Sequence, residues 1–134
     1  MENSEQFFDF AAEVGFTKHI GGVEATEEMV RLCQIGAGSY VMDVGCGAGV
    51  TPVFIAKKYG CRVVGVDILE GMVQKSKERG EREGITDLVE FRVADAQDLP
   101  FEDALFDAVI TESVTAFPED KQKAVREYAR VTKP

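Results

Sequence analysis

The stretch VMDVGCGAGVTP, residues 41–52, decides the fold of this chain. Three glycines, Gly45, Gly47 and Gly49, directly follow an apolar run that carries one carboxylate, Asp43. This order predicts a β-strand that turns sharply into a helix, because glycine accepts positive φ and lets another group lie against the backbone. Open α/β sheets bind their ligands at the carboxyl ends of their strands. We therefore expect a ligand site at this turn.

The rest of the chain alternates short apolar runs with helical patterns. This alternation is typical of a parallel sheet flanked by helices. The predicted strands are 40–45, 62–67, 89–95 and 106–113, and the predicted helices are 5–16, 26–35, 51–60, 70–83 and 119–131. Helical spacing predicts that helix 26–35 buries Met29, Val30 and Cys33. In the same way, helix 119–131 is predicted to bury Ala124, Val125, Tyr128 and Ala129. No strand follows the last helix, so the fourth strand is expected to keep an open edge.

Composition limits the classes of function. A chain of 134 residues with 45% hydrophobic and 29% charged residues fits one globular domain. With 24 acidic against 15 basic residues, the net charge is 15 − 24 = −9, so nucleic acid is not expected as a partner. No apolar run approaches the ~20 residues that span a bilayer, and the N-terminus does not resemble a signal peptide. We expect a cytoplasmic protein without membrane contact.

The three cysteines, Cys33, Cys46 and Cys61, form neither an even set nor a CxxC pair. This spacing argues against a disulfide framework and against a zinc site. They are interpreted as reduced thiols, and no metal is expected.

Four stretches together resemble class I S-adenosylmethionine-dependent methyltransferases of the broad small-molecule group. These are VMDVGCGAG (41–49), VVGVDI (63–68), VADAQDLPF (93–101), and FDAVITESV (106–114) with the terminal RVTKP (130–134). The resemblance covers about residues 19–134. It implies an α/β fold with a three-layer Rossmann-like parallel sheet in strand order 3-2-1-4. Residues 1–134 would form a single cofactor-binding domain that ends after the helix following strand four, without the C-terminal strands of the family.

The resemblance implies S-adenosylmethionine as cofactor and S-adenosylhomocysteine as product. In it, the glycine loop packs against the methionine part, Asp43 positions the amino group, Asp67 accepts the ribose hydroxyls, and Asp95 accepts the adenine amino group. Ile68 and Met72 are predicted to sandwich the adenine. The complete predicted set is Asp43, Gly45, Cys46, Gly47, Gly49, Asp67, Ile68, Met72, Asp95, Ala96 and Glu112.

Chemistry supports the same carboxylates. The cofactor carries a sulfonium, an ammonium group and a carboxylate, so its pocket should combine acids with exposed main-chain amides. Asp43, Asp67 and Asp95 each end or edge a predicted strand and should gather at one end of the sheet. Each also has a structural alternative: Asp67 could cap a helix, Asp95 could stabilise a turn, and Asp43 could bond nearby amides. Met72 could equally be a core residue.

The reaction needs few side chains. Methyl transfer is an in-line displacement, and a base is required only where the acceptor must lose a proton. His19 and Glu112 are weak candidates for that role, and no catalytic residue is assigned. An Asn-Pro-Pro-Tyr type motif is missing after the fourth strand, which favours a small-molecule acceptor over an amide or base amino group.

Two alternatives remain open. The chain could be a cofactor-binding fragment or module without turnover that forms a homodimer through the exposed edge of the fourth strand. A nicotinamide-dependent oxidoreductase is the more remote alternative, because Val50 stands where a GxGxxG fingerprint requires its third glycine.

Overall fold

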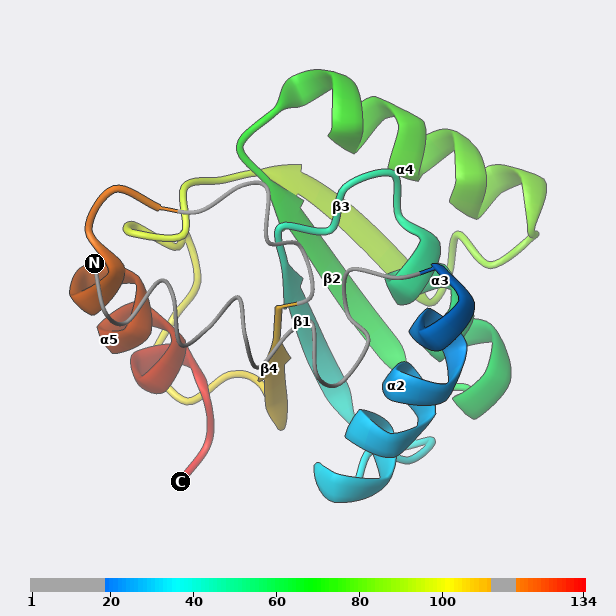
Figure 1. The fold of residues 1–134 in the computed structure, drawn as a ribbon, viewed down its shortest axis with the longest axis horizontal. Coiled ribbons are helices and arrows are strands. Elements are labelled where there is room, and N and C mark those ends of the chain that lie inside the picture. Colours follow the sequence, from blue (N-terminus) through cyan, green and yellow to red (C-terminus); the bar gives the residue numbers. More distant parts are fainter. Residues whose placement is uncertain (1–18, 112–117) are drawn as a thin grey trace.

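A computed structural model describes residues 19–111 and 118–134 of the chain (Figure 1). The predicted helix 5–16 lies outside these residues. The elements in chain order are α2 (His19–Leu32), β1 (Tyr40–Val44), α3 (Val50–Tyr59), β2 (Arg62–Asp67), α4 (Glu70–Arg82), β3 (Val89–Val93), β4 (Ala108–Ile110) and α5 (Lys121–Val131). Each predicted strand from the sequence has its counterpart among them, with β4 shorter than expected.

The four strands form one parallel sheet in the order β3-β2-β1-β4, which confirms the predicted order. Asp43 lies beside Gly65 in the β1–β2 pair, and Asp67 lies beside Val93 in the β2–β3 pair. The register therefore aligns the carboxyl ends of β1, β2 and β3.

Helices cover both faces of the sheet, so the domain has three layers. Figure 1 shows α5 on one side and α2, α3 and α4 on the other. Consecutive strand residues alternate between two cores, since successive side chains of a strand point to opposite faces. The core beneath α2, α3 and α4 includes Val30, Val41, Val53, Ile55, Val63, Val73, Phe91 and Ile110, and the core beneath α5 includes Met42, Val44, Val64, Val66, Leu99, Phe106 and Val131.

Local signals define the end of α3, where the sequence predicts it, and the start of α5. Gly60 closes α3 in the left-handed conformation, with φ of 70°, and its N–H donates to the Ala56 carbonyl at 2.9 Å. Asp120 caps α5, because its side chain accepts from the Lys123 N–H at 3.0 Å. These two hydrogen bonds therefore fix where α3 ends and where α5 begins.

Two predictions of helix burial are wrong. The second helix spans His19–Leu32, so Cys33 lies beyond it in a turn and is exposed. In α5, Val125 is 60% exposed and Ala129 is also exposed. The positions facing the sheet are Ala124, the half-buried Tyr128, and Val131, at the four- and three-residue steps of a helix.

β4 forms an edge of the sheet within the described residues. Thr132 pairs in parallel with Phe106, just before β4, and the Lys133 N–H donates to the Phe106 carbonyl at 2.8 Å. Beyond that point, residues 19–111 and 118–134 supply no strand to the outer edge of Ala108–Ile110. In the same part of the chain, no helix combines the length and apolar character needed to cross a bilayer.

Candidate cofactor site

Three acidic residues lie at the carboxyl end of the sheet. Asp43 precedes the last residue of β1, Asp67 ends β2, and Asp95 follows β3 by two residues. Asp43 is 1% exposed and Asp67 is 3% exposed. Because the three strands are parallel and in register, the sheet brings these carboxylates to one end, as the sequence predicts.

Asp67 joins the glycine loop to the turn after β2. Its Oδ2 accepts from the Gly47 N–H and its Oδ1 accepts from the Leu69 N–H, both at 2.9 Å. An ionised carboxylate offers about four acceptor positions, so roughly two remain after these bonds. That capacity matches the pair of hydroxyls of a ribose.

Gly47 and Gly49 of the loop differ in the space around their Cβ positions. All three have positive φ: 74° at Gly45, 58° at Gly47 and 85° at Gly49. A Cβ on Gly47 would meet no atom within 4 Å, whereas a Cβ on Gly49 would stand 2.9 Å from the Cβ of Ser76. Gly47 therefore faces open space where a ligand could lie, and Gly49 is required for close packing of the loop on α4.

The first amides of this loop are bonded within the protein. The N–H groups of Gly45 and Cys46 both donate to the Val66 carbonyl, at 2.8 and 2.9 Å, and that of Gly47 donates to Asp67. The loop curls back over the end of β2, which brings these donors onto acceptors of the protein. The loop leaves open backbone surface for a ligand at Gly47, where no side chain lies within 4 Å of the Cβ position.

Helix α4 braces the loop through two residues that the sequence analysis missed. The Ser76 hydroxyl donates to the Gly47 carbonyl at 2.8 Å, and the Arg79 Nε donates to the Ala48 carbonyl at 3.1 Å. Ser76 is fully buried. A serine at an inward position of a charged helix was the signal that could have identified it.

The side chain of Cys46 belongs to the core. It is buried, and its Sγ lies 3.7 Å from the Ser76 Oγ and 3.8 Å from the Gly47 carbonyl oxygen. Burial, and then the negative charge of Asp43, raise the pKa of the Cys46 thiol to about 12. The thiol is therefore neutral at physiological pH and not a nucleophile.

Apolar side chains follow the buried Asp67 along the chain, in the turn after β2 and in the first turn of α4. Ile68 is 55% exposed and Leu69 is 56% exposed, and Met72 is half-buried one turn further. Exposed aliphatic groups beside a buried carboxylate suit a ligand with a flat ring attached to a polar sugar. Leu69 was not among the predicted residues.

Asp95 forms the predicted turn. Its Oδ1 accepts from the backbone N–H of Gln97 at 2.9 Å and from the Gln97 side-chain amide at 3.2 Å. Burial, and then the charge of Asp95, raise the pKa of Tyr128, which places this carboxylate near the α5 layer. Ala96 is half-buried and packs against the core beneath α5.

Two predicted positions cannot be placed by their side chains. Glu112 lies outside the described residues. His19 is the first residue of α2, and only its backbone is described.

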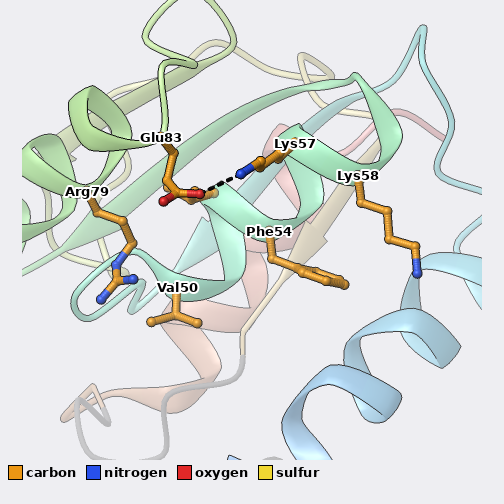
Figure 2. Close-up of a pocket in the computed structure, with 7 residues that line it drawn as sticks. Val50, Phe54, Lys57, Lys58, Arg79 and Glu83 are labelled. Carbon is orange, nitrogen blue, oxygen red and sulfur yellow. Dashed lines mark hydrogen bonds and ion pairs between the residues drawn. The ribbon is translucent and has the colours of Figure 1, made fainter.

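A hollow of about 370 Å³ lies apart from these acids, between α3 and α4 (Figure 2). Its cationic rim is largely neutralised: Lys57 pairs with Glu83 at 2.8 Å, and Lys58 pairs with Glu27 of α2 at 2.6 Å. None of the predicted site residues lines it; the lining residues are Val50, Val53, Phe54, Lys57, Lys58, Arg79 and Glu83. The hollow is therefore not the candidate site.

Comparison with known families decides the classification. A family model described as a methyltransferase domain matches residues 42–134. The chain belongs to the class I S-adenosylmethionine-dependent methyltransferases. S-adenosylmethionine is the cofactor of this family.

Individual relatives agree with the classification. The chain is 36% identical to the methyltransferase GfsG of Streptomyces halstedii, over 84% of this chain and 41% of that protein. It is 32% identical to a sarcosine/dimethylglycine N-methyltransferase of Halorhodospira halochloris, over 73% of this chain and 35% of that protein. A solved geranyl diphosphate methyltransferase, in complex with GPP and sinefungin, superposes with a TM-score of 0.76 and 27% identity, over 86% of this chain and 43% of that one.

The chain covers only part of the length of its relatives. It spans between 22% and 55% of the length of the first curated relatives that it matches. The family model's match begins within β1 and runs through β4, and so it contains the glycine loop and the acids at the end of the sheet.

The described residues of this methyltransferase domain fit the family cofactor. The open face at Gly47 leaves room at the backbone, the spare acceptor positions of Asp67 match a ribose, and the exposed Ile68 offers an apolar surface to a base. These three features lie within the turns that end β1 and β2.

Proposed function

We propose that the chain binds S-adenosylmethionine at the carboxyl end of β1, β2 and β3 and transfers its methyl group to a small-molecule acceptor. One observation carries this proposal: the buried Asp67 holds the glycine loop through Gly47 and, after a second bond to Leu69, still has spare acceptor capacity. A carboxylate in that position recognises a sugar diol and would repel a phosphate.

The proposed residue roles are those that the family resemblance implies. Asp67 accepts the ribose hydroxyls, Ile68 and Met72 contact the adenine, and Asp95 accepts from its amino group beside Ala96. The loop from Gly45 to Gly49, with Cys46 inside it, lies against the methionine part, and Asp43 attracts its ammonium group. Glu112, which follows β4 in the sequence and lies outside the described residues, is the last member of the proposed set.

The bound cofactor supplies a methyl group that a sulfonium has already activated. The protein's task is therefore to orient the two reactants and to exclude water, and well-oriented reactants can remove several kcal/mol of the barrier. The hydrogen bonds at Asp67, Gly47 and Ser76 keep the loop rigid, which suits this task. A base is needed only for an acceptor that loses a proton, and His19 and Glu112 remain candidates for it.

A small-molecule acceptor is the substrate class that we infer. The net charge of −9 disfavours binding to a phosphate backbone. Two of the relatives are named for small acceptors, sarcosine with dimethylglycine and geranyl diphosphate.

Calorimetric titration tests the cofactor assignment. S-adenosylmethionine and NAD are titrated separately into the chain, and heat of binding is expected for the former alone. Binding of NAD without binding of S-adenosylmethionine would overturn the proposal.

A second candidate is a cofactor-binding module without turnover, which pairs with another copy through β4. The outer edge of Ala108–Ile110, which lacks a partner strand among the described residues, favours it. Light scattering after size exclusion would then find a dimer that shows no methyl transfer. A monomer that methylates a small acceptor would reject this candidate.

A further inference from the structure

Gly47 is held from two sides by residues of different elements. Its N–H donates to the Oδ2 of Asp67 at 2.9 Å, and its carbonyl accepts from the Ser76 hydroxyl at 2.8 Å. Both partners are buried, Asp67 with 3% and Ser76 with 0% of its surface exposed. One bond fixes the peptide plane before Gly47 and the other fixes the plane after it.

This double hold matters because glycine is the residue with the greatest backbone freedom. Gly47 has φ of 58° and no Cβ to restrict it. Without the bond from Ser76, its carbonyl can rotate, and the N–H on the other side of the same residue can turn away from Asp67. The carboxylate would then keep a fixed partner only at Leu69, in its own turn.

We propose that Ser76 is a positioning residue of the cofactor site, which fixes Gly47 and thereby holds the Asp67 carboxylate in the orientation that accepts the ribose hydroxyls. This inference rests on the proposed function. It gives a positioning role to a residue of α4 that faces the loop and is not among the residues predicted to contact the cofactor.

A purely structural role for Ser76 makes a different prediction. Ser76 also packs against Gly49 and lies 3.7 Å from the Cys46 Sγ, so its loss could lower stability without changing the site. Arg79 offers a comparison, because it bonds the carbonyl of Ala48, one residue further along the loop. Its loss loosens the loop without removing either bond of Gly47.

The experiment is a double-mutant cycle on the chain, with Ser76→Ala, Asp67→Asn and the two combined. The dissociation constant for S-adenosylmethionine is measured by calorimetry, and the thermal midpoint is measured alongside. Ser76→Ala is expected to raise the dissociation constant about 2- to 10-fold, the range that one hydrogen bond supports. In the Asp67→Asn background, Ser76→Ala should raise the dissociation constant less than about 2-fold. The effects of two substitutions are not additive when the residues act as one unit.

Matched variants and a direct readout separate the roles. Lys77→Ala, at an exposed position of α4, should leave the dissociation constant unchanged. Arg79→Gln should raise it by a smaller factor than Ser76→Ala does. Hydrogen exchange followed by NMR should be faster at the Gly47 amide in Ser76→Ala than in the unaltered chain.

Each contrary outcome has a definite meaning. An unchanged dissociation constant in Ser76→Ala, even with a lower thermal midpoint, overturns the inference. An equal fold-change in both Asp67 backgrounds, or unchanged exchange at Gly47, also overturns it. Failure of the unaltered chain to bind S-adenosylmethionine overturns the proposed function, and the inference with it, and is recognised before any variant is compared.

Discussion

Gly49 lies so close to Ser76 that a Cβ on the glycine would stand 2.9 Å from the Cβ of the serine. Real Cβ atoms do not approach so closely, so the contact admits no side chain. Together with φ of 85°, this closeness restricts the position to glycine.

Gly49→Ala is therefore expected to destabilise the domain. The left-handed backbone costs about 1–2 kcal/mol for a residue with a Cβ, and crowding against buried Ser76 adds about 1–3 kcal/mol. Urea denaturation measures the free energy of unfolding. Gly60→Ala is the matched control, because Gly60 has φ of 70° but open space around its Cβ position. Equal losses in both variants would show that the crowding has no energetic effect.

Asp67→Ala should weaken binding of S-adenosylmethionine by about 1–3 kcal/mol, the usual loss when a buried hydrogen-bonding group loses its partner. The ribose hydroxyls would lose their acceptor, and the amides of Gly47 and Leu69 would lose theirs. Isothermal calorimetry measures the change. Asp87→Ala removes the same charge from an exposed position and should leave the affinity unaltered. An unchanged affinity in Asp67→Ala would make this residue structural.

Cys46 should make stability depend on alkaline pH. Its pKa is raised from 9.0 to about 12 by burial and by the charge of Asp43. Between these values the unfolded thiol has lost its proton and the folded one has kept it. The unfolded state therefore binds fewer protons, and the free energy of unfolding falls as pH rises.

The fall in the free energy of unfolding due to this thiol should approach about 1.4 kcal/mol per pH unit. This slope corresponds to one proton more bound in the folded than in the unfolded state. Denaturation at pH 9, 10 and 11 measures the slope, and Cys46→Ala should have a shallower one. The comparison concerns slopes, since the substitution also leaves a small cavity that lowers stability at every pH. Parallel slopes would contradict the assigned pKa.

Arg130→Lys tests how α5 holds the loop that carries Asp95. The Arg130 guanidinium binds Glu127 and donates to the carbonyls of Phe101 and Leu99 at 2.7 and 3.0 Å. Lysine keeps the charge but lacks the planar set of donors. The side chain is about one-third exposed, so we expect a loss of about 1–2 kcal/mol after discounting for solvent.

Thermal unfolding measures this loss. Arg126→Lys, at an exposed position of the same helix, is the control and should have a midpoint near that of the unaltered chain. If Arg130→Lys lowers the midpoint no more than Arg126→Lys does, the guanidinium contacts add nothing to stability.

Periodicity predicted much of the fold, because strands and helices depend on spacing within a few residues. The alternation of apolar runs located β1, β2 and β3, and Gly60 marked the end of α3. The same reasoning failed for Val125 and Ala129, which fit a helical face that the sheet does not cover, and for Cys33, which lies beyond the end of α2. Spacing along a helix says which residues share a face, but not which face finds a partner.

The sequence by itself determined the three acids and the glycine turn at the end of the sheet, since parallel strands must bring their carboxyl ends together. Only the tertiary structure decided how that turn is held. The bonds of Gly47 to Asp67 and Ser76, and of Ala48 to Arg79, join residues 20 to 31 positions apart. Such contacts depend on how α4 packs beside the loop, and no local pattern encodes that distance.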